Sequence, residues 1–247
     1  MKITFLGTGT SSGVPYLGCD CVVCRSQNPK DNRLRASVLL EVDGKHFLID
    51  CGPDFRQQAL RAGIKKIDAV LLTHEHVDHM MGLDDLRVFG ETHLYADKNT
   101  CEAIQRVFSY CFNSKYHGIP QFVLHEIKNE PFVISDVEFI PIEVMHYQLP
   151  IHCYRVGDFA YITDFKTIKE EEKMKLKGVN TLVVNALRFK DHFSHATVDE
   201  ALVLINEIAP KRAYLTHVSH EIGFHDEVNE KLPENVFLAY DGLELQV

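Results

Sequence analysis

Short apolar segments separated by turn residues recur along the chain, and this pattern predicts a protein rich in β-strands. Residues 2–6 alternate apolar and polar side chains, as a half-buried strand does. Residues 36–42 and 45–49 flank Asp43-Gly44, a two-residue sequence typical of a β-hairpin. Asp241-Gly242 predicts a second hairpin-like turn near the C-terminus. Further strands are expected over residues 69–73, 132–134, 137–145, 159–163, 181–184 and 212–216.

Helix signals lie between these strands. Pro53 favours the start of a first helix and Gly63 its end, and residues 80–89 have the pattern of a second helix. Two capping-box sequences predict further helix starts at Asn99-Thr100-Cys101-Glu102 and Thr197-Val198-Asp199-Glu200. Strand pairs in each half with helices between them predict a mixed α/β fold built in layers.

Composition limits the class of protein. Apolar residues make up 45% of the chain and charged residues 25%, which is enough for a sizeable core. No linker or low-complexity segment divides residues 1–247, so we expect one domain. No segment is apolar enough to span a membrane, and seven cysteines without an export signal predict a cytoplasmic protein. The net charge of −9 argues against a basic nucleic-acid-binding surface.

A cluster of candidate metal ligands follows the apolar strand of residues 69–73. The sequence His74-Glu75-His76-Val77-Asp78-His79 carries three imidazoles and an aspartate within one short loop. His74 and His76 can point the same way in an extended segment, while Asp78 and His79 begin the next turn. This loop can therefore serve two metal ions.

The same local arrangement, an apolar strand followed by one ligand-type residue, recurs at His146, Asp164 and His217. A lone histidine is more often a hydrogen-bonded structural residue than a ligand. Strand ends that meet at one edge of a sheet are, however, where sites gather in α/β proteins. The set as a whole therefore predicts metal chemistry.

The His-x-His-x-Asp-His sequence of residues 74–79 resembles the loop of the metallo-β-lactamase superfamily, and the resemblance covers almost the whole chain. It implies a four-layer αββα sandwich and two divalent ions at the active site, Zn or Mn. Asp50 matches an early strand-end aspartate that braces the loop without itself binding a metal ion. The implied ligands are His74, His76 and His146 for one ion, Asp78, His79 and His217 for the other, and Asp164 as a bridge.

A second metal signature lies nearer the N-terminus. Cys19, Cys21 and Cys24 form a Cys-x-Cys-x-x-Cys cluster, and three thiolates suit a tetrahedral structural zinc. A fourth ligand is needed, for which His220 is the first candidate and His225 the second. The remaining cysteines lack such spacing and are expected to be buried hydrophobic residues: Cys51, Cys101, Cys111 and Cys153.

The cysteine cluster sharpens the resemblance. Together with the glycine-rich segment of residues 7–15 and with Thr216-His217-Val218-Ser219-His220, it is similar to the phosphoribosyl 1,2-cyclic phosphate phosphodiesterase (PhnP-like) branch. That branch is related to the tRNA 3′-processing endonuclease. The resemblance implies a phosphodiesterase that hydrolyses small, cyclic or nucleotide-like phosphodiesters.

His195-Ala196-Thr197 resembles the His-x-Thr element that supplies the general acid in these phosphodiesterases. Thr197 also fits a helix N-cap, and the two roles are compatible. His192 is a weaker candidate for the acid, while Arg188 and Lys190 are expected to be solvated loop charges. The implied mechanism has a metal-bridging hydroxide attack phosphorus while His195 protonates the leaving oxygen, so the expected catalytic residues are His195, Asp78 and Asp164.

Three alternatives remain open at this stage. A thioester or lactone hydrolase could use the same ligands, an RNA-processing nuclease is disfavoured by the acidic charge, and a non-catalytic metal-binding protein is disfavoured by the complete ligand set. The aromatic segment of residues 110–117 is expected to be a packed insertion that influences specificity. The expected partner is a small phosphodiester, without membrane or nucleic acid. The oligomeric state stays open, and a homodimer is compatible with the sequence.

Overall fold

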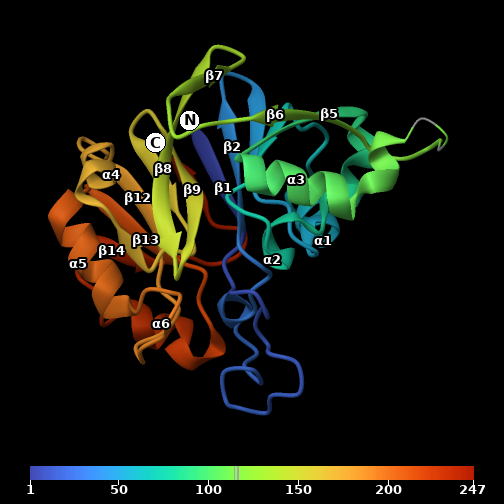
Figure 1. Cartoon of the computed structure of the whole chain (residues 1–247). Coiled ribbons are helices and arrows are strands. Elements are labelled where there is room, and N and C mark those ends of the chain that lie inside the picture. The colour runs from blue at the N-terminus through green and yellow to red at the C-terminus, as the bar shows by residue number, and fades with distance from the viewer. Residues whose placement is uncertain (114, 116) are drawn as a thin grey trace.

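The computed structural model describes residues 1–113, 115 and 117–247, and its centre is a pair of β-sheets packed face to face (Figure 1). Tyr116, one aromatic of the expected insertion, lies outside the described residues. The first sheet has the order β15-β1-β2-β3-β4-β5-β6. Its strands are β1 (Lys2–Gly7), β2 (Ser37–Val42), β3 (Lys45–Ile49), β4 (Ala69–Leu71), β5 (Glu91–Ala96), β6 (Gln121–Glu126) and β15 (Glu244–Gln246).

The second sheet has the order β11-β8-β9-β10-β12-β13-β14, with β7 paired to β8. Its strands are β7 (Phe132–Ile134), β8 (Val137–His146), β9 (Leu149–Val156), β10 (Phe159–Ile162), β11 (Thr167–Ile168), β12 (Thr181–Asn185), β13 (Arg212–Thr216) and β14 (Val236–Leu238). Each sheet is antiparallel on one side and parallel on the other: β15-β1-β2-β3 and β11-β8-β9-β10 are antiparallel, whereas β3-β4-β5-β6 and β10-β12-β13-β14 are parallel.

Helices cover the outer faces of both sheets and complete an αββα sandwich (Figure 1). Over the first sheet lie α1 (Phe55–Ala62), η2 (Leu83–Phe89), α3 (Lys98–Val107) and η3 (Ser109–Phe112). Over the second sheet lie α4 (Glu170–Met174), α5 (Val198–Ile208), η4 (His220–Ile222) and α6 (His225–Asn229). The four layers agree with the architecture that the sequence resemblance implies.

Large aromatic side chains fill the space between the sheets. Phe5 and Phe47 of the first sheet and Phe139, Tyr154 and Tyr161 of the second are completely buried there. The Phe47 and Phe139 rings meet edge to face across the interface, with centroids 5.1 Å apart. Burial of aromatic side chains removes the largest apolar areas from water, so this layer holds the two sheets in fixed relation.

Most of the predicted strands are confirmed, and three local expectations are wrong. Asp97, and not Asn99, caps α3, because its side chain accepts a hydrogen bond from the Thr100 backbone. Residues 80–89 form the end of a short helix, α2 (Val77–Met80), and a separate 3₁₀ segment. The turn at Asp241-Gly242 joins β14 of the second sheet to β15 of the first, so it is a crossover between sheets and not a hairpin.

The glycine- and cysteine-containing segment between β1 and β2 leaves the sandwich as a long loop, which includes η1 (Pro29–Asp31) (Figure 1). A short parallel bridge from Gly9 to Val218 ties the start of this loop to the segment after β13. The loop and the C-terminal segment are therefore neighbours, although about 200 residues separate them in the chain. No helix in the described part of the chain is long and apolar enough to cross a membrane.

Candidate metal centre

Both sheets deliver ligand-type residues to the same edge of the sandwich. His74 follows β4 of the first sheet, while His146 ends β8, Asp164 follows β10 and His217 follows β13 of the second. These four segments end at the side opposite the two termini (Figure 1). The recurring strand-then-ligand pattern thus corresponds to one place in the fold.

The loop of residues 74–79 ends in α2, whose N-cap is His76. Asp78 and His79 lie in the first turn of this helix and are buried, whereas His76 is exposed. Gly52 packs directly against the Asp78 carbonyl, where any Cβ atom would collide with the backbone. The close approach explains why this position holds glycine.

Three residues that follow strands at the site have a left-handed backbone. The φ angles are 62° at Asp50, 54° at Asp164 and 54° at His217. This region is uncommon for residues other than glycine, and such conformations concentrate at functional sites. The chain therefore breaks from the sheet where each of these side chains is presented.

His74, His76 and His146 form the first group of candidate ligands. One nitrogen from each ring lies within 4.8 Å of the others. The ring centroids are 4.4 Å apart for His74 and His76, and 5.1 Å apart for His76 and His146.

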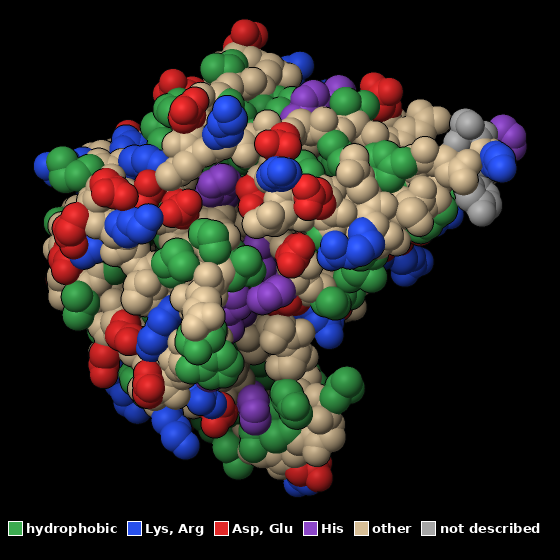
Figure 2. Space-filling view, in the orientation of Figure 1, with side chains coloured by type: hydrophobic (Ala, Val, Ile, Leu, Met, Phe, Trp, Pro, Cys, Tyr) green, Lys and Arg blue, Asp and Glu red, His purple; other side chains and the backbone are tan. Residues whose placement is uncertain are grey.

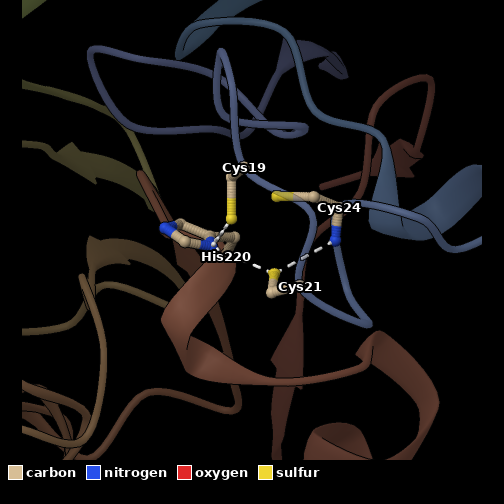
Figure 3. Close-up of side chains that lie close together, drawn as sticks. All are labelled: Cys19, Cys21, Cys24 and His220. Atoms are coloured by element: carbon tan, nitrogen blue, oxygen red, sulfur yellow. Dashed lines mark hydrogen bonds between the residues drawn. The ribbon is translucent and has the colours of Figure 1, made fainter.

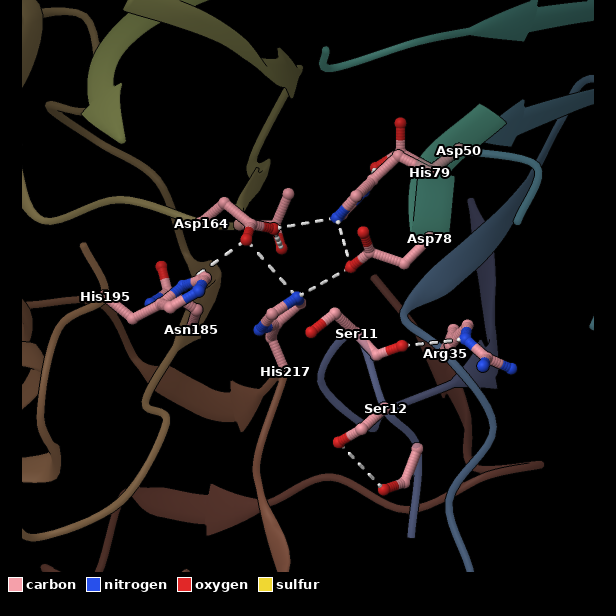
Figure 4. Close-up of polar contacts among 12 residues, drawn as sticks. Ser11, Ser12, Arg35, Asp50, Asp78, His79, Asp164, Asn185, His195 and His217 are labelled. Carbon is pink, nitrogen blue, oxygen red and sulfur yellow. Dashed lines mark hydrogen bonds and ion pairs between the residues drawn. The ribbon is translucent and has the colours of Figure 1, made fainter. Parts of the chain in front are cut away.

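Asp78, His79 and His217 form the second group, and Asp164 lies next to His79 and His217 (Figure 4). The Asp164 Oδ2 atom is 3.1 Å from Nε2 of His79, and its Oδ1 atom is 3.3 Å from Nε2 of His217. The Asp78 Oδ2 atom is 3.1 Å from the same Nε2 atom of His79. Asp164 also joins His74 and His79 in a further candidate cluster. One carboxylate therefore touches both groups.

The hydrogen bonding of the imidazoles fits a metal role. Nδ1 of His79 contacts Asp50, Nδ1 of His146 contacts the Ser194 carbonyl, and Nδ1 of His74 contacts the Thr73 hydroxyl. Among the described residues, Nε2 of His74 has no hydrogen-bond partner, and Nε2 of His79 and of His217 lies 3.1–3.5 Å from carboxylate oxygens without a well-aligned hydrogen bond. Buried nitrogens left unpaired are costly, and convergent Nε2 atoms are what a divalent cation needs.

The protonation states of three candidate ligands agree with this fit, whereas Asp78, Asp50 and Asp164 outweigh the effect of burial and raise the pKa of His79. Burial lowers the pKa of His74 well below its usual value, so its imidazole is neutral and free to coordinate. Burial alone would raise the pKa values of Asp78 and Asp164, but the neighbouring His79 and His217 lower both overall. The two carboxylates are thus anionic, the form that binds a cation.

Asp50 lies beneath the ligands, as the sequence predicts for a bracing residue. Its carboxylate accepts hydrogen bonds from the backbone and the hydroxyl of Thr73 at 2.8–3.0 Å, and its Oδ2 lies 2.7 Å from Nδ1 of His79. It is completely buried. The contact fixes the His79 ring with Nε2 toward the site.

The candidate acid His195 lies beside the bridging carboxylate. Its Nδ1 atom is 3.3 Å from Oδ1 of Asp164, and its ring stacks on His217 with centroids 5.0 Å apart (Figure 4). Thr197 forms the predicted capping box with Glu200 and starts α5. The structure therefore brings His195 next to the candidate ligands. The His192 ring lies beside that of His195, with centroids 5.2 Å apart.

Several residues around the centre carried no sequence signal. Asn185, at the end of β12, accepts a hydrogen bond from the Phe165 backbone and so fixes the turn after Asp164. Arg188 was expected to be a solvated loop charge, but its side chain is only 19% exposed and pairs with Glu221. Lys190 is exposed, as expected. Single polar residues of this kind become recognisable only through their contacts.

Cys19, Cys21, Cys24 and His220 converge at the base of the projecting loop (Figure 3). Nδ1 of His220 is 3.6 Å from Sγ of Cys19 and 3.3 Å from Sγ of Cys21. Ligand atoms about 2.0–2.3 Å from one tetrahedral zinc lie at comparable mutual separations. The contact with His220 lowers the pKa of the Cys21 thiol to about 6. The four residues therefore fit a zinc ion.

His225, the other candidate for this cluster, is directed elsewhere. Its Nδ1 atom lies 3.1 Å from the guanidinium of buried Arg33. Of the other four cysteines, Cys51, Cys101 and Cys153 are buried as expected, and Cys111 is half-buried.

A cavity of about 350 Å³ opens beside the first group of histidines. Its lining consists of His76, His146, Tyr147, Gln148, Leu149, Phe193 and Ser194. Figure 2 shows histidine side chains gathered in a hollow in the middle of one face of the molecule. Tyr147 and Phe193 could not be predicted as site residues from the sequence, because an aromatic residue in a loop has no distinguishing pattern.

A family model described as the beta-lactamase superfamily domain matches residues 45–218, which include the candidate ligands at positions 74 to 217. The chain belongs to the metallo-β-lactamase superfamily. Within this superfamily, a crystal structure of a diphosphatase from the PhnP family superimposes with a TM-score of 0.94 and 42% sequence identity, over 100% of this chain and 97% of that one. The chain thus also belongs to the PhnP family.

Two curated relatives of this chain are named for activities other than that of a diphosphatase. An octanoyltransferase from Porphyromonas gingivalis is 46% identical over 251 residues, which cover 99% of this chain and 51% of the relative. A ribonuclease Z from Methanococcus maripaludis is 27% identical over 208 residues, which cover 78% of this chain and 58% of the relative. The chain spans about half the length of these relatives.

Proposed function

We propose that this protein is a metal-dependent phosphodiesterase that hydrolyses small phosphodiesters. In this proposal His74, His76 and His146 hold one divalent ion, Asp78, His79 and His217 hold a second, and Asp164 bridges them. Cys19, Cys21, Cys24 and His220 hold a separate structural zinc. When bound, the paired ions supply Lewis acidity that neutralises phosphoryl oxygens and activates water.

One observation carries the proposal: Asp164 contacts His79 through Oδ2 and both His217 and His195 through Oδ1. Its carboxylate also lies within 4.8 Å of ligand atoms of His74 and of His146, so one buried side chain joins both candidate ligand groups to the candidate acid. Its neighbourhood excludes bulk water, because His79, His195 and His217 are all buried. Attraction between a phosphoryl group and fixed charges is strengthened in such surroundings.

His195 acts on the leaving oxygen in this scheme. Burial lowers the pKa of His195 to about 3, so the free site holds a neutral imidazole. An anionic phosphodiester placed beside it favours the protonated form, and the proton then moves to the departing oxygen. The adjacent N-terminus of α5, capped by Thr197, favours negative charge in the same place.

The substrate class is supported by the family match with a diphosphatase. Diphosphates and phosphodiesters share the attacked phosphoryl group, so one site can accept either bond. The octanoyltransferase relative favours a second candidate function, acyl-ester or thioester hydrolysis at the same ligands. The ribonuclease Z relative favours an RNA substrate, although the net charge of −9 opposes an extended polyanion.

A substrate panel on metal-analysed protein tests the proposal. The purified chain, loaded with zinc or manganese and assayed by elemental analysis, is compared on cyclic and linear phosphodiesters, a disubstituted diphosphate, a thioester and a short RNA. We expect turnover of small phosphorus substrates and loss of that turnover in Asp164→Ala. Metal-replete protein that cleaves only the thioester would make the acyl hydrolase the better assignment.

A further inference from the structure

The cavity beside the first histidine group combines candidate metal ligands with exposed aromatic side chains. His76 and His146 line it together with Tyr147 and Phe193. A group bound at the ligands therefore extends directly into this space. We call the cavity the Tyr147–Phe193 pocket and keep that name below.

The two aromatic rings are exposed to an unusual degree for their size. Tyr147 is 56% exposed and Phe193 68% exposed, although both lie next to buried residues of the site. The rings meet edge to face with centroids 5.6 Å apart, and the His192 ring lies 4.7 Å from that of Phe193. Exposed aromatic faces beside a site are platforms on which a planar ring can stack.

The backbone also holds Tyr147 in place. This residue follows His146 with a φ of 56°, in the left-handed region, at the turn between β8 and β9. Phe193 precedes Ser194, whose carbonyl contacts Nδ1 of His146. Both aromatic residues are thus next in sequence to residues that form or orient the candidate ligand His146. Their positions relative to a phosphoryl group bound at the candidate ligands are therefore fixed.

The charge of the lining indicates what the pocket accepts. Its described walls contain no lysine, arginine, aspartate or glutamate. On the neighbouring segments Arg188 pairs with Glu221, and Lys166 pairs with Glu200 and Asp191. Lys190 is exposed and does not belong to the pocket lining. A second phosphate group would find no cation there, whereas an uncharged ring would find apolar surface.

We propose that the Tyr147–Phe193 pocket is a subsite for a heteroaromatic ring, so that the substrate is a phosphodiester or diphosphate that carries a nucleobase. The inference rests on the proposed function, because the pocket is placed relative to a phosphoryl group at the candidate ligands. It assigns specificity to Tyr147 and Phe193, which take no part in the chemical step.

Binding of AMP and ribose 5-phosphate tests the proposal, because the two ligands share sugar and phosphate and differ in adenine. Their dissociation constants are measured by calorimetry on the metal-loaded protein. We expect AMP to bind about 5- to 150-fold more tightly, the range that stacking of one base supplies. Equal affinities would overturn the proposal.

Variants locate the preference. Tyr147→Ala combined with Phe193→Ala should abolish the advantage of AMP and leave the affinity for ribose 5-phosphate within twofold, which also shows that the site is intact. Tyr147→Phe keeps the ring and should keep the preference. Phe112→Ala removes another exposed aromatic, on η3 outside the pocket lining. It lies in the segment for which the sequence predicts an influence on specificity, and we expect the preference for AMP to persist in this variant. An AMP preference that survives the double substitution contradicts the proposal.

These experiments distinguish failure of the subsite proposal from failure of the proposed function. A protein that hydrolyses phosphodiesters but binds AMP and ribose 5-phosphate equally retains the function and loses the subsite. A protein that loses an AMP preference in the double variant, yet cleaves no phosphodiester, retains the subsite and loses the function.

Discussion

Asp50 and His79 form a buried pair in which Oδ2 of the aspartate lies 2.7 Å from Nδ1 of the histidine. The contact leaves Nε2 of His79 as the nitrogen that faces Asp78 and Asp164. Asp50 reaches none of the substrate-facing space, so its effect on the site passes through His79. In the proposed function Asp50 is therefore a positioning residue.

We expect Asp50→Asn to weaken metal binding by about 10–100-fold, because the neutral amide supports the His79 ring less well. Metal affinity is measured by competition with a chromogenic chelator, and activity is measured at saturating metal. Recovery of activity at high metal concentration distinguishes loss of positioning from loss of chemistry. An unchanged metal affinity would show that the pair is only structural.

His195→Ala should lower kcat by about 10²–10⁴-fold on a phosphodiester with an alkyl leaving group. The loss should be much smaller on a p-nitrophenyl ester, since a good leaving group needs no proton. His192→Ala provides the matched control, because its ring neighbours that of His195 while the ion-pair contact with Asp164 is made by His195. Equal losses on both esters, or retained alkyl-ester activity with unchanged metal content, would remove His195 from the acid role.

Cys21→Ser should cost one zinc equivalent per chain and lower the melting temperature, while the paired site keeps its metal. The reason is that Cys21 contacts His220 and so joins the projecting loop to the segment after β13. Elemental analysis and thermal unfolding measure the two effects. Cys111→Ser is the control, since that thiol belongs to no candidate cluster among the described residues. Full zinc content in Cys21→Ser contradicts the assignment.

The depressed pKa of His225 should lower the free energy of unfolding of the protein as the pH falls into the mildly acidic range. Burial lowers the pKa of His225 to about 4, and the nearby cations of Arg33 and Lys30 act in the same direction. The folded state therefore holds neutral imidazole, so the stabilisation is complete above the unfolded pKa of about 6.5 and is lost as pH falls toward 4.

The measurement compares the free energy of unfolding at pH 7 and pH 5 for the wild type and His225→Asn, whose amide oxygen can still accept from Arg33. Linkage predicts that the wild type loses about 2 kcal/mol more than the variant over this interval. Parallel pH dependence in the two proteins would mean that His225 titrates normally in the folded state.

Local sequence determined much of this protein. The Asp43-Gly44 hairpin, the Thr197–Glu200 capping box and most strands follow from residue patterns within about ten positions, because turn chemistry and side-chain periodicity act over that range. The loop of residues 74–79 was recognisable for the same reason, and strand-end positions marked His146, Asp164 and His217 as candidates. The helix start at Asp97 was missed because two nearby residues could serve as the cap.

Only the tertiary structure decided which distant residues meet. The packing of the first sheet, which contains β4, against the second, which contains β8, β10 and β13, places the candidate ligands together. The crossover at Asp241 joins these sheets, which the sequence could not tell apart. The choice of His220 beside the cysteines, and of Arg33 beside His225, depends on contacts about 200 residues apart in the chain. The Tyr147–Phe193 pocket has no sequence signal, since a cavity is the space left by packing, and packing is a property of the folded chain as a whole.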